Sequence, residues 1–480
     1  MIFRFLYIKA LACLLPLSLA GQTFFNGVVC NTNKEPLAFA HISVLGKRNI
    51  GTVANGFGSF TISTELGDII VISHLGYKDL VVSTSLRSDT LFLQTDILSL
   101  DQVTITPESA PKRAEDFVRL AIKRIPSNYD TNPHVLRSYY RLTNTDGKRY
   151  VRFLDAAVSI YEPGVDKVEQ PAFNVDEVRS SIDNRRGQYI GWLKEMTYGK
   201  TPSQMNELKL KELKSKAQST SSSDIQEATP EDLQFFESKA SWNALWHFYY
   251  VNYIRNREKT PSRNHPFNGE LQEDFIDLHK FKIDSIIAGQ SGESIYVIKI
   301  LPSSKSPEYM FQKGSIPVGR LYIRDSDYAI LQMDYSYIIN PKSSKFNHWY
   351  AMKARGTTVF FKTSVRYKEA ANGLLYPSYL YKWEYDKQAY QYGGFNNKEN
   401  PTYYFVESEW IINEVIFESA AVEKIFPCVN CNENLFESKR SYNADFWKMY
   451  PILKETTIQE KLRRDLEVEL SLEEQFKKAK

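Results

Sequence analysis

The chain has 480 residues and a formal net charge of +3, with 60 basic and 57 acidic side chains. This length predicts two or three domains with cores of their own and argues against large-scale disorder. A nearly neutral charge gives no electrostatic basis for binding nucleic acid, so we expect no nucleic-acid partner. The 30 Tyr and 28 Phe residues raise the aromatic share to 14%, which favours sheet-rich structure.

Residues 1–20 have the pattern of a secretory signal peptide. Arg4 and Lys9 flank and interrupt an apolar stretch that ends in Leu17-Ser18-Leu19-Ala20, with small residues at the last positions before a cleavage site. The apolar stretch continues well past Cys13, which argues against lipidation of that cysteine. No later segment reaches the ~18 apolar residues of a membrane-spanning helix, so we expect no transmembrane segment in the mature chain.

Residues 21–106 alternate short apolar runs with turn residues, the pattern of an antiparallel β-sandwich. The predicted strands are 25–30, 40–45, 58–62, 69–74, 80–83, 91–93 and 102–106. Asn55-Gly56 is a turn dipeptide, and Gly51 and Gly76 stand where we expect the chain to reverse. This region therefore predicts a small seven-stranded domain.

The same region carries a set of residues that resembles a known family. The motifs are Gly27-x-Val29, Pro36-Leu37, Ala40-x-Ile42-x-Val44, Gly51-Thr52, Asn55-Gly56-x-Gly58-x-Phe60-x-Ile62, Ile70-x-Ile72-Ser73, Gly76-Tyr77 and Leu100-Asp101-Gln102-Val103-Thr104-Ile105. Together they resemble the carboxypeptidase-regulatory-like domain, which implies a transthyretin-like sandwich. In Bacteroidota such domains commonly precede TonB-dependent outer-membrane receptors and other envelope proteins. The signal peptide predicts export across the inner membrane, and together with this resemblance it predicts a place in the periplasm or at the outer membrane. The resemblance implies no peptidase activity.

Residues 107–126 have the pattern of a polar linker followed by a helix. Ala114, Phe117, Val118, Ala121 and Ile125 fall at helical spacing on one face, and we expect the proline at position 126 to end the helix.

A second domain is predicted over residues 127–450. It begins with strands at 138–141 and 156–161 around a hairpin turn at Asp146-Gly147. This stretch resembles the region after the sandwich in uncharacterised Bacteroidota envelope proteins, and the resemblance implies no activity. Residues 165–230 are polar and irregular and predict a flexible insertion.

An aromatic helix is expected over residues 231–257, where large apolar residues recur at threes and fours. From residue 280 to 419 apolar residues recur at every second position, as in β-strands, and Asn372-Gly373 is a strong hairpin-turn signal. Successive hairpins predict an antiparallel meander whose apolar face the helix covers. The expected fold is therefore mainly β with α+β character: the sandwich, then a larger curved antiparallel sheet or half-barrel packed on helices. The likeness to periplasmic lipoprotein carriers is a fold analogy only.

Residues 451–480 predict a charged helical tail. Thr457-x-x-Glu460 and Ser471-x-x-Glu474 are two capping-box signatures at expected helix starts. The tail also resembles the ending of the same envelope proteins.

Motifs for catalysis and cofactor binding are missing from the sequence. None of the seven histidines has the Glu or His partner at the spacing that zinc peptidases use, so we expect no metal site. Gly289-Gln290-Ser291-Gly292 lacks the spacing of a nucleophile elbow and predicts a loop between strands. No nucleotide-binding or calcium motif occurs, so we expect no cofactor and no catalytic residue of a known motif.

Cys428-Val429-Asn430-Cys431 is the one compact constellation. The pair supplies two of the four ligands of a structural zinc site, and only Cys30 could add another thiol. A redox role requires the pair at a helix N-terminus after a strand, whereas Pro427 precedes it here. We favour a structural disulfide between Cys428 and Cys431.

Two functions remain open on these grounds. The first is a non-catalytic envelope protein whose sandwich docks onto, or binds, an outer-membrane protein, glycan or lipid. The second is a secreted hydrolase whose active site is dispersed over the region after residue 112, where no motif reveals it. The missing catalytic motifs favour the first.

Overall fold

A computed structural model describes residues 23–478 apart from 38, 47–50, 55–57, 86–88, 97–112, 170, 186, 191–218, 220–224, 229–247, 249–250, 256–270, 272, 290–292, 307–313, 341–358, 387–403, 427–434, 436–440 and 451–456. The chain divides into two compact units, residues 1–95 with 453–456, and residues 96–452 with 457–480. Strands β1 to β7 belong to the first unit and the later elements to the second.

Seven short strands build the first unit. They are β1 (Thr23–Asn31), β2 (His41–Val44), β3 (Gly51–Val53), β4 (Ser59–Thr64), β5 (Ile69–Ser73), β6 (Leu80–Ser83) and β7 (Thr90–Leu93). They form two sheets, with strand orders β4-β1-β7 and β3-β2-β5-β6. Ile42, Ile70 and Ile72 are completely buried in the core cluster of this unit. The predicted seven-stranded β-sandwich is confirmed.

Two details of the sandwich differ from the prediction. Gly51 begins strand β3, which pairs antiparallel with β2, where we expected a turn. Three residues are too few to show a period of two, so the pattern could not reveal this strand. β1 and β7 pair in parallel rather than antiparallel, because strand direction follows the connections between sheets and not the alternation within a strand. The predicted strand 102–106 and turn Asn55-Gly56 lie outside the described residues.

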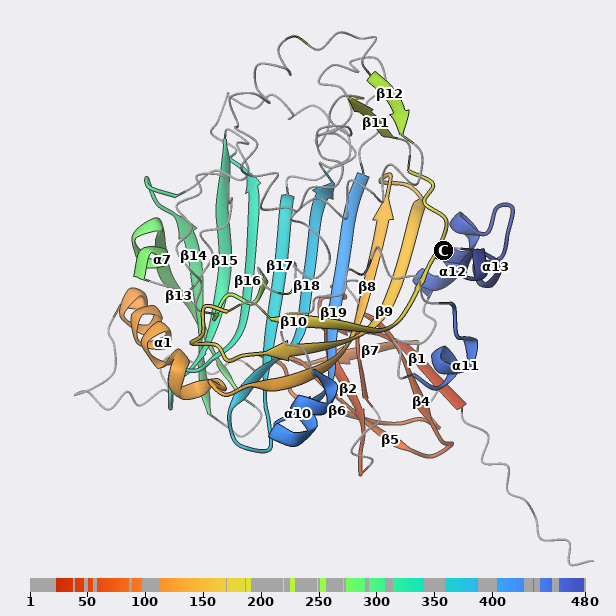
Figure 1. Ribbon diagram of the computed structural model, residues 1–480. Coiled ribbons are helices and arrows are strands. Elements are labelled where there is room, and N and C mark those ends of the chain that lie inside the picture. The colour runs from red at the N-terminus through yellow and green to blue at the C-terminus, as the bar shows by residue number, and fades with distance from the viewer. Residues whose placement is uncertain are drawn as a thin grey trace, which may run out of the picture. The chain divides into compact units, whose positions relative to one another are not determined.

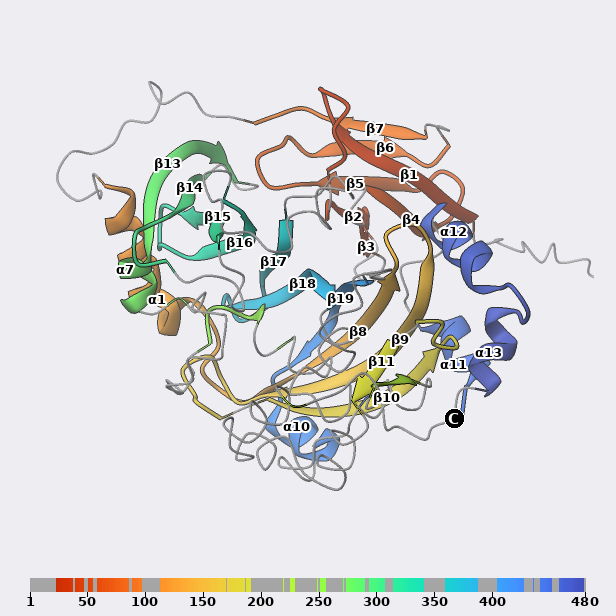
Figure 2. The same cartoon turned by 90° about the horizontal axis from the view of Figure 1, so that it is seen from above.

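One antiparallel sheet of ten strands dominates the second unit (Figure 1). Its strands are β8 (His134–Thr145), β9 (Tyr150–Glu162), β10 (Ala172–Ser180), β13 (His279–Ala288), β14 (Ser294–Pro302), β15 (Ser315–Arg324), β16 (Ile330–Ile339), β17 (Val359–Glu369), β18 (Leu375–Asp386) and β19 (Tyr404–Ile416). The order is β10-β9-β8-β19-β18-β17-β16-β15-β14-β13. The meander of β13 to β19 is thus extended by the hairpin of β8 and β9, because β8 pairs with β19. Figure 2 shows the strands following a curve, and the described strands do not close into a barrel.

Both predicted hairpin turns are present in this sheet. Gly147 lies between β8 and β9 with φ of +85°, and Gly373 lies between β17 and β18 with φ of +80°. Only glycine adopts these left-handed angles without steric cost. The two dipeptides therefore set the register of their hairpins.

Two adjacent residue rows cross the whole sheet, and they differ sharply in polarity. Each row takes one residue from every strand, and each of these residues is the cross-strand partner of the next. From β10 to β13 the apolar row is Val178, Ala156, Tyr140, Trp410, Leu380, Val365, Met333, Leu321, Ile298 and Ile283. The next residue on each strand points to the opposite face. That neighbouring row is polar throughout, so the sheet has an apolar face and a face lined with charge.

The apolar face is filled by residues from the rest of the unit. Helix α1 (Ala114–Asn128) buries the predicted stripe of Ala114, Phe117, Val118, Ala121 and Ile125 in this core. The Tyr129 hydroxyl donates to the Ile330 carbonyl at 2.5 Å and accepts from the Ile330 amide at 3.0 Å, which fixes the end of α1 to β16.

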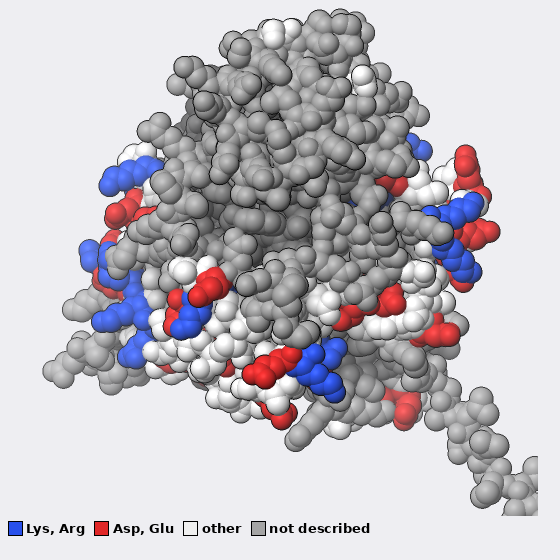
Figure 3. Space-filling view, viewed as in Figure 1, with Lys and Arg blue, Asp and Glu red and all other residues white. Residues whose placement is uncertain are grey.

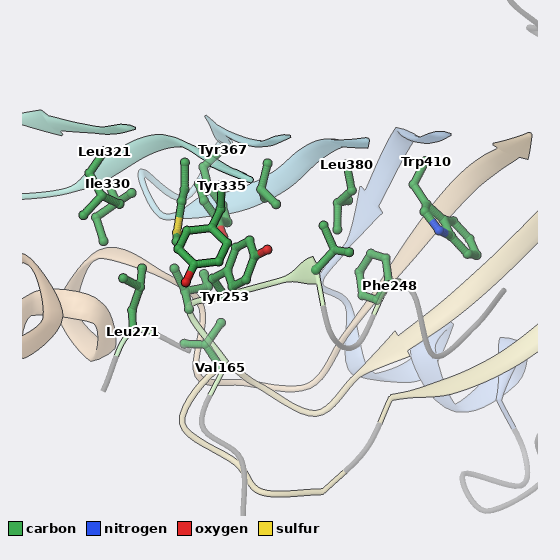
Figure 4. Packing of buried hydrophobic residues seen from close by; sticks show 14 of the residues in the cluster. Val165, Phe248, Tyr253, Leu271, Leu321, Ile330, Tyr335, Tyr367, Leu380 and Trp410 are labelled. Carbon is green, nitrogen blue, oxygen red and sulfur yellow. The ribbon is translucent and has the colours of Figure 1, made fainter. Parts of the chain in front are cut away.

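Figure 4 shows the other side of this packing. Phe248, Tyr253, Leu271 and Val165 lie across from the sheet residues Leu321, Ile330, Tyr335, Tyr367, Leu380 and Trp410. Among the described residues the sheet interior is therefore packed with protein side chains, which does not favour a cavity for an acyl chain. Most of the predicted helix 231–257 lies outside the described residues, but Phe248, Val251, Tyr253 and Ile254 are buried in this core.

Helix α1 continues past the proline that was expected to end it. Pro126 stands inside the last turn, and the helix ends at Asn128. A proline there removes one amide donor, and the turn survives because Tyr129 donates its backbone N–H to the Ile125 carbonyl at 3.1 Å.

The predicted flexible insertion at 165–230 is wrong for its first part. Residues 172–180 form β10 at one end of the large sheet, and Phe173 and Val175 are buried in the core. β10 carries a bulge between Val175 and Glu177, which breaks the alternation that would have identified the strand. Strands β11 (Gly187–Ile190) and β12 (Ile225–Ala228) pair with each other in a separate two-stranded sheet.

Short helices complete the second unit: α7 (Glu273–Leu278), α10 (Ser419–Ile425), α11 (Ala444–Met449), α12 (Thr457–Leu466) and α13 (Leu472–Lys478). No helix among the described residues is long and apolar enough to cross a membrane.

The charged tail is a packed element. Leu462, Leu466, Leu472 and Phe476 form a small core with Tyr150 and Phe153 of β9. Gln475 is buried and donates its side-chain amide to the carbonyls of Leu466 and Leu470. The predicted capping box at the start of α13 is present, because Ser471 donates its N–H to Glu474 and Glu474 donates its N–H to the Ser471 hydroxyl. The Thr457 and Glu460 side chains lie outside the described residues.

Removing the Phe476 ring tests whether this packing holds the tail. Phe476→Ala should weaken tail docking by about 3 kcal/mol, because it leaves a cavity against Phe153 and Tyr442. Amide exchange in α12 and α13 should then accelerate roughly a hundredfold. Lys477→Ala, at an exposed neighbour, is the control and should leave exchange unchanged. Equal amide-exchange rates in the two variants would contradict the packing of the tail by Phe476.

Candidate functional site

The polar row of the large sheet is the most concentrated chemistry among the described residues. From β10 to β13 it consists of Arg179, Asp155, Arg141, Glu409, Tyr381, Ser364, Asp334, Arg320, Lys299 and Lys282. Neighbouring strands bring opposite charges directly across from each other at the β10 end, which is the favourable cross-strand arrangement. We call this set the polar row.

Asp155 is the centre of the buried end of the row. It is completely buried and accepts hydrogen bonds from Tyr139 Oη at 2.5 Å and Arg141 Nε at 3.0 Å. Arg179 donates to its other oxygen from Nη2 at 2.8 Å and from Nε at 3.2 Å. Three neighbouring strands therefore meet at one carboxylate.

The two guanidinium groups decide the charge of Asp155. Burial by itself would raise the pKa of Asp155, but the positive charges of Arg141 and Arg179 outweigh it and hold the pKa below the ordinary value. Asp155 is thus a carboxylate at neutral pH, and its hydrogen bonds are charge-assisted.

Aromatic rings from the C-terminal part of the chain cover the arginine at the β10 end. The Arg179 guanidinium lies 4.5 Å from the Trp447 ring centroid and 5.3 Å from the Phe476 ring centroid. Cation–π contacts of this kind favour the charged guanidinium. Helices α11 and α13 therefore stabilise the same ion cluster that Asp155 organises.

Further along the row, two glutamates share one face of β19. Glu407 and Glu409 are two residues apart, so their Cα atoms lie about 7 Å apart. Tyr379 Oη donates to Glu409 Oε1 at 2.8 Å, and Tyr381 hydrogen bonds to Glu407. Each carboxyl group thus has a tyrosine on the neighbouring strand β18.

The environment of this pair favours the protonated form. Loss of hydration on burial, and then the negative charge of Glu409, raise the pKa of Glu407 to about 7. Burial also raises the pKa of Glu409, while the hydrogen bond from Tyr379 and the charge of Arg141 oppose that shift. A carboxyl group that titrates near neutral pH beside a second carboxyl group can exchange protons with a bound molecule.

The row becomes solvent-exposed toward β13. Arg320 Nε donates to Asp284 at 3.2 Å, and Lys299 lies 4.0 Å from the same carboxylate, with side chains that are partly exposed. On the face seen in Figure 3, the described residues carry both acidic and basic side chains. Within the described residues no three His, Cys, Asp or Glu side chains are placed to hold a metal ion.

A second candidate is the outward face of the sandwich sheet that contains β2, β5 and β6. Leu45, Ile69 and Val81 are 60%, 40% and 59% exposed there. Val71 stands directly across from Val81, and the Leu45 amide donates to the Ile69 carbonyl at 2.8 Å, so these side chains are neighbours. We call Leu45, Ile69, Val71 and Val81 the sandwich apolar face.

The residues singled out from the sequence have different outcomes. Cys428 and Cys431 lie outside the described residues, so the disulfide stays a prediction. Cys30 is a buried free thiol. Gly289 lies between β13 and β14, as the predicted loop requires, and residues 290–292 are outside the described part.

Sequence reasoning missed Asp155, Glu407 and Glu409. Asp155 stands between Leu154 and Ala156, whereas Glu407 and Glu409 flank Ser408. The period-two spacing of these strands was the available signal. Such spacing shows which residues share one face of a strand, but it does not show which carboxyl groups lie opposite each other on neighbouring strands.

Asp155 provides the first test of the polar row. Asp155→Asn should lower the free energy of unfolding by about 3–5 kcal/mol, because it leaves Arg141 and Arg179 buried without a counter-charge. Asp284→Asn, on the same sheet face at the exposed end, should cost less than about 1 kcal/mol. Chemical denaturation measures both, and similar losses would contradict the central role of Asp155.

Glu407 provides a test by pH. Its folded pKa of about 7 lies above the ordinary value near ~4.3. Protonated Glu407 therefore contributes fully to the free energy of unfolding below pH ~4, and this contribution is lost as the pH rises through 7. Glu407→Gln mimics the protonated form, so its melting temperature should rise relative to the unmodified chain between pH 5 and 8. Glu414→Gln, at an exposed position on the same strand, should show no such trend.

Comparisons with known proteins concern mainly the first unit. Residues 25–105 match the sequence model of the CarboxypepD_reg-like domain. The TonB-dependent receptor SusC of Bacteroides thetaiotaomicron is 33% identical over 86 residues, which are 18% of this chain and 8% of that receptor. The chain thus spans less than a tenth of this relative.

Two solved structures align with this chain at low TM-scores. A LolA superfamily protein from Nitrosomonas europaea aligns at 8% identity with a TM-score of 0.24, covering 64% of this chain and 95% of that one. The Pseudomonas aeruginosa MucA/MucB complex aligns at 6% identity and a TM-score of 0.15, covering 65% and 96%. TM-scores this low support no argument about fold or function.

The sequence match and the confirmed sandwich agree, and residues 25–105 form a CarboxypepD_reg-like domain.

Proposed function

We propose that this chain is a non-catalytic protein of the cell envelope that uses its sandwich to dock onto an outer-membrane component. On this proposal it is exported across the inner membrane and works in the periplasm or at the outer membrane. The docking target is an outer-membrane protein, glycan or lipid. The CarboxypepD_reg-like match and the similarity to part of a TonB-dependent receptor support the envelope setting.

The sandwich apolar face is the observation that carries the proposal. Leu45, Ile69 and Val81 expose large apolar side chains on one side of one sheet. Contact between water and clustered apolar side chains is unfavourable. A partner that covers them gains about 25 cal/mol of binding free energy for each Å² of apolar surface buried. The inward positions of the same strands already form the core, so the outward face is available for docking.

A charge on this face should weaken docking. Leu45→Lys is expected to lower recovery of an envelope partner about tenfold, because burying a leucine side chain contributes about 1.5 kcal/mol. The measurement is co-purification of the full chain from envelope fractions of crosslinked cells. Val468→Lys, at an exposed apolar residue of the second unit, is the control and should keep full recovery. A free monomer in crosslinked cells would refute docking.

A secreted hydrolase is the second candidate, and the glutamate pair of β19 favours it. Glu407 has a pKa of about 7 and stands beside Glu409, and each has a tyrosine partner. One carboxyl group of such a pair can donate a proton while the other accepts one. This arrangement lies after residue 112, the region in which the alternative hypothesis places a dispersed active site.

Substrate screening separates the two candidates. The purified chain is assayed on peptide, ester and glycan substrates from pH 5 to 8, with Glu407→Gln and Glu409→Gln in parallel. A hydrolase built on this pair should lose at least about a hundredfold in rate in either variant. The docking proposal expects no turnover in any of the three proteins. Activity that survives both substitutions would exclude this pair as the active site.

A further inference from the structure

The polar row of the large sheet ends in a group of cations on β13, β14 and β15. Lys282 lies directly across from Lys299, and Lys299 lies directly across from Arg320. Lys280 stands two residues from Lys282 on β13 and therefore shares its face of the sheet. Lys280 and Lys282 are exposed, and the side chains of Lys299 and Arg320 are 43% and 48% exposed. We call these four residues the basic patch.

Nearby carboxylates offset only part of this charge. Asp284 accepts a hydrogen bond from Arg320 Nε at 3.2 Å and lies 4.0 Å from Lys299 Nζ, so one carboxylate serves two cations. Asp334, across from Arg320 on β16, accepts its hydrogen bonds from side chains of β16 and β17 instead. Among the described residues the two lysines of β13 have no ion-pair partner. The basic patch therefore keeps an excess of positive charge at the surface.

The position of these cations does not serve the stability of the sheet. Like charges directly across from each other destabilise an antiparallel strand pair. At the β10 end the same row alternates Arg179, Asp155 and Arg141, which is the favourable order. At the β13 end three cations follow one another without an acid between them in the row. An anionic partner would relieve this repulsion.

Protection of the sheet edge explains only part of the basic patch. Lysines on an edge strand prevent unwanted strand pairing, and β13 is the last strand in the described order of its sheet. That role fits Lys280 and Lys282. Lys299 and Arg320 stand on β14 and β15, which have paired strands on both sides and need no such protection.

We propose that the basic patch binds the phosphate groups of anionic lipids at a membrane surface. Its side chains project from one face of three strands that lie about 4.8 Å apart, so they form a broad array rather than a cage around one group. A membrane presents many phosphates in one plane, and each basic side chain near an anionic surface adds to binding. This contact goes beyond docking by the sandwich, because it belongs to the second unit and requires no docking partner.

Vesicle sedimentation of the full chain tests this contact. The chain should bind vesicles of mixed phosphatidylglycerol and phosphatidylcholine, and not vesicles of phosphatidylcholine alone. Lys282→Gln should lower the partition coefficient about fivefold, and Asp284→Asn should raise it about fivefold, because each changes the charge of the surface by one unit. Lys424→Gln removes an exposed lysine of α10 and is the matched control, for which we expect unchanged binding.

Thermal unfolding of the same variant separates binding from a structural role. Lys282→Gln removes a like-charge contact with Lys299, so its melting temperature at low salt should equal or exceed that of the unmodified chain. A lower melting temperature together with full vesicle binding would assign Lys282 to the fold and overturn the proposal.

Three further results would overturn the membrane contact. They are equal binding to both kinds of vesicle, binding that persists in ~1 M salt, where charges are screened beyond ~3 Å, and binding that Lys282→Gln leaves intact. Inorganic phosphate is the second arm. A complex with free phosphate that releases the chain from vesicles would assign the basic patch to a soluble phosphate compound. The vesicles contain no protein, so their result is independent of partner recovery with Leu45→Lys.

Discussion

The structure of the second unit depends on the alternation of two residue rows across ten paired strands. The row that contains Trp410 and Leu380 faces the core, and the row that contains Asp155 and Glu409 faces away from it. Because side chains alternate between faces, a shift of one residue in any strand pair would place carboxylates in the core and leucines against arginines. Hydrophobic burial on one face and charge pairing on the other therefore enforce the same register.

The C-terminal helices extend this constraint beyond the sheet. Trp447 and Phe476 cover the guanidinium of Arg179, which in turn holds the carboxylate of Asp155. The tail is thus coupled to the buried ion cluster by an aromatic layer. Its residues Leu462 and Leu466 pack with Tyr150 and Phe153 of β9, and Asp465 accepts the backbone N–H of Tyr150. A buried charge cluster is stable only when its partners are held in place, and the packed tail supplies part of that support.

The two units offer different kinds of surface to other molecules. The sandwich carries exposed apolar side chains on the outward face of one sheet, and burial is the favourable way to recognise them. The large sheet has its chemistry in carboxyl groups, tyrosines and arginines that already pair with one another. Most of these groups serve the fold, and the pair formed by Glu407 and Glu409 stands apart because the pKa of Glu407 lies near neutral pH. The proposed docking function uses the first of these surfaces, and the hydrolase alternative uses the second.

Local sequence patterns were enough to predict the local features of this protein. Alternating apolar residues placed six of the sandwich strands and the meander, helical spacing placed the buried face of α1, and Asp146-Gly147 and Asn372-Gly373 placed two hairpins. These features depend on neighbours in the chain, so a pattern reveals them. Three features depend on the tertiary structure: β8 pairs with β19, β10 completes the sheet despite its bulge, and β1 and β7 run parallel. The tertiary structure also decided that Arg179, Asp155, Arg141 and Glu409 meet, because pairing between strands far apart in the chain is set by packing of the whole core and leaves no local trace.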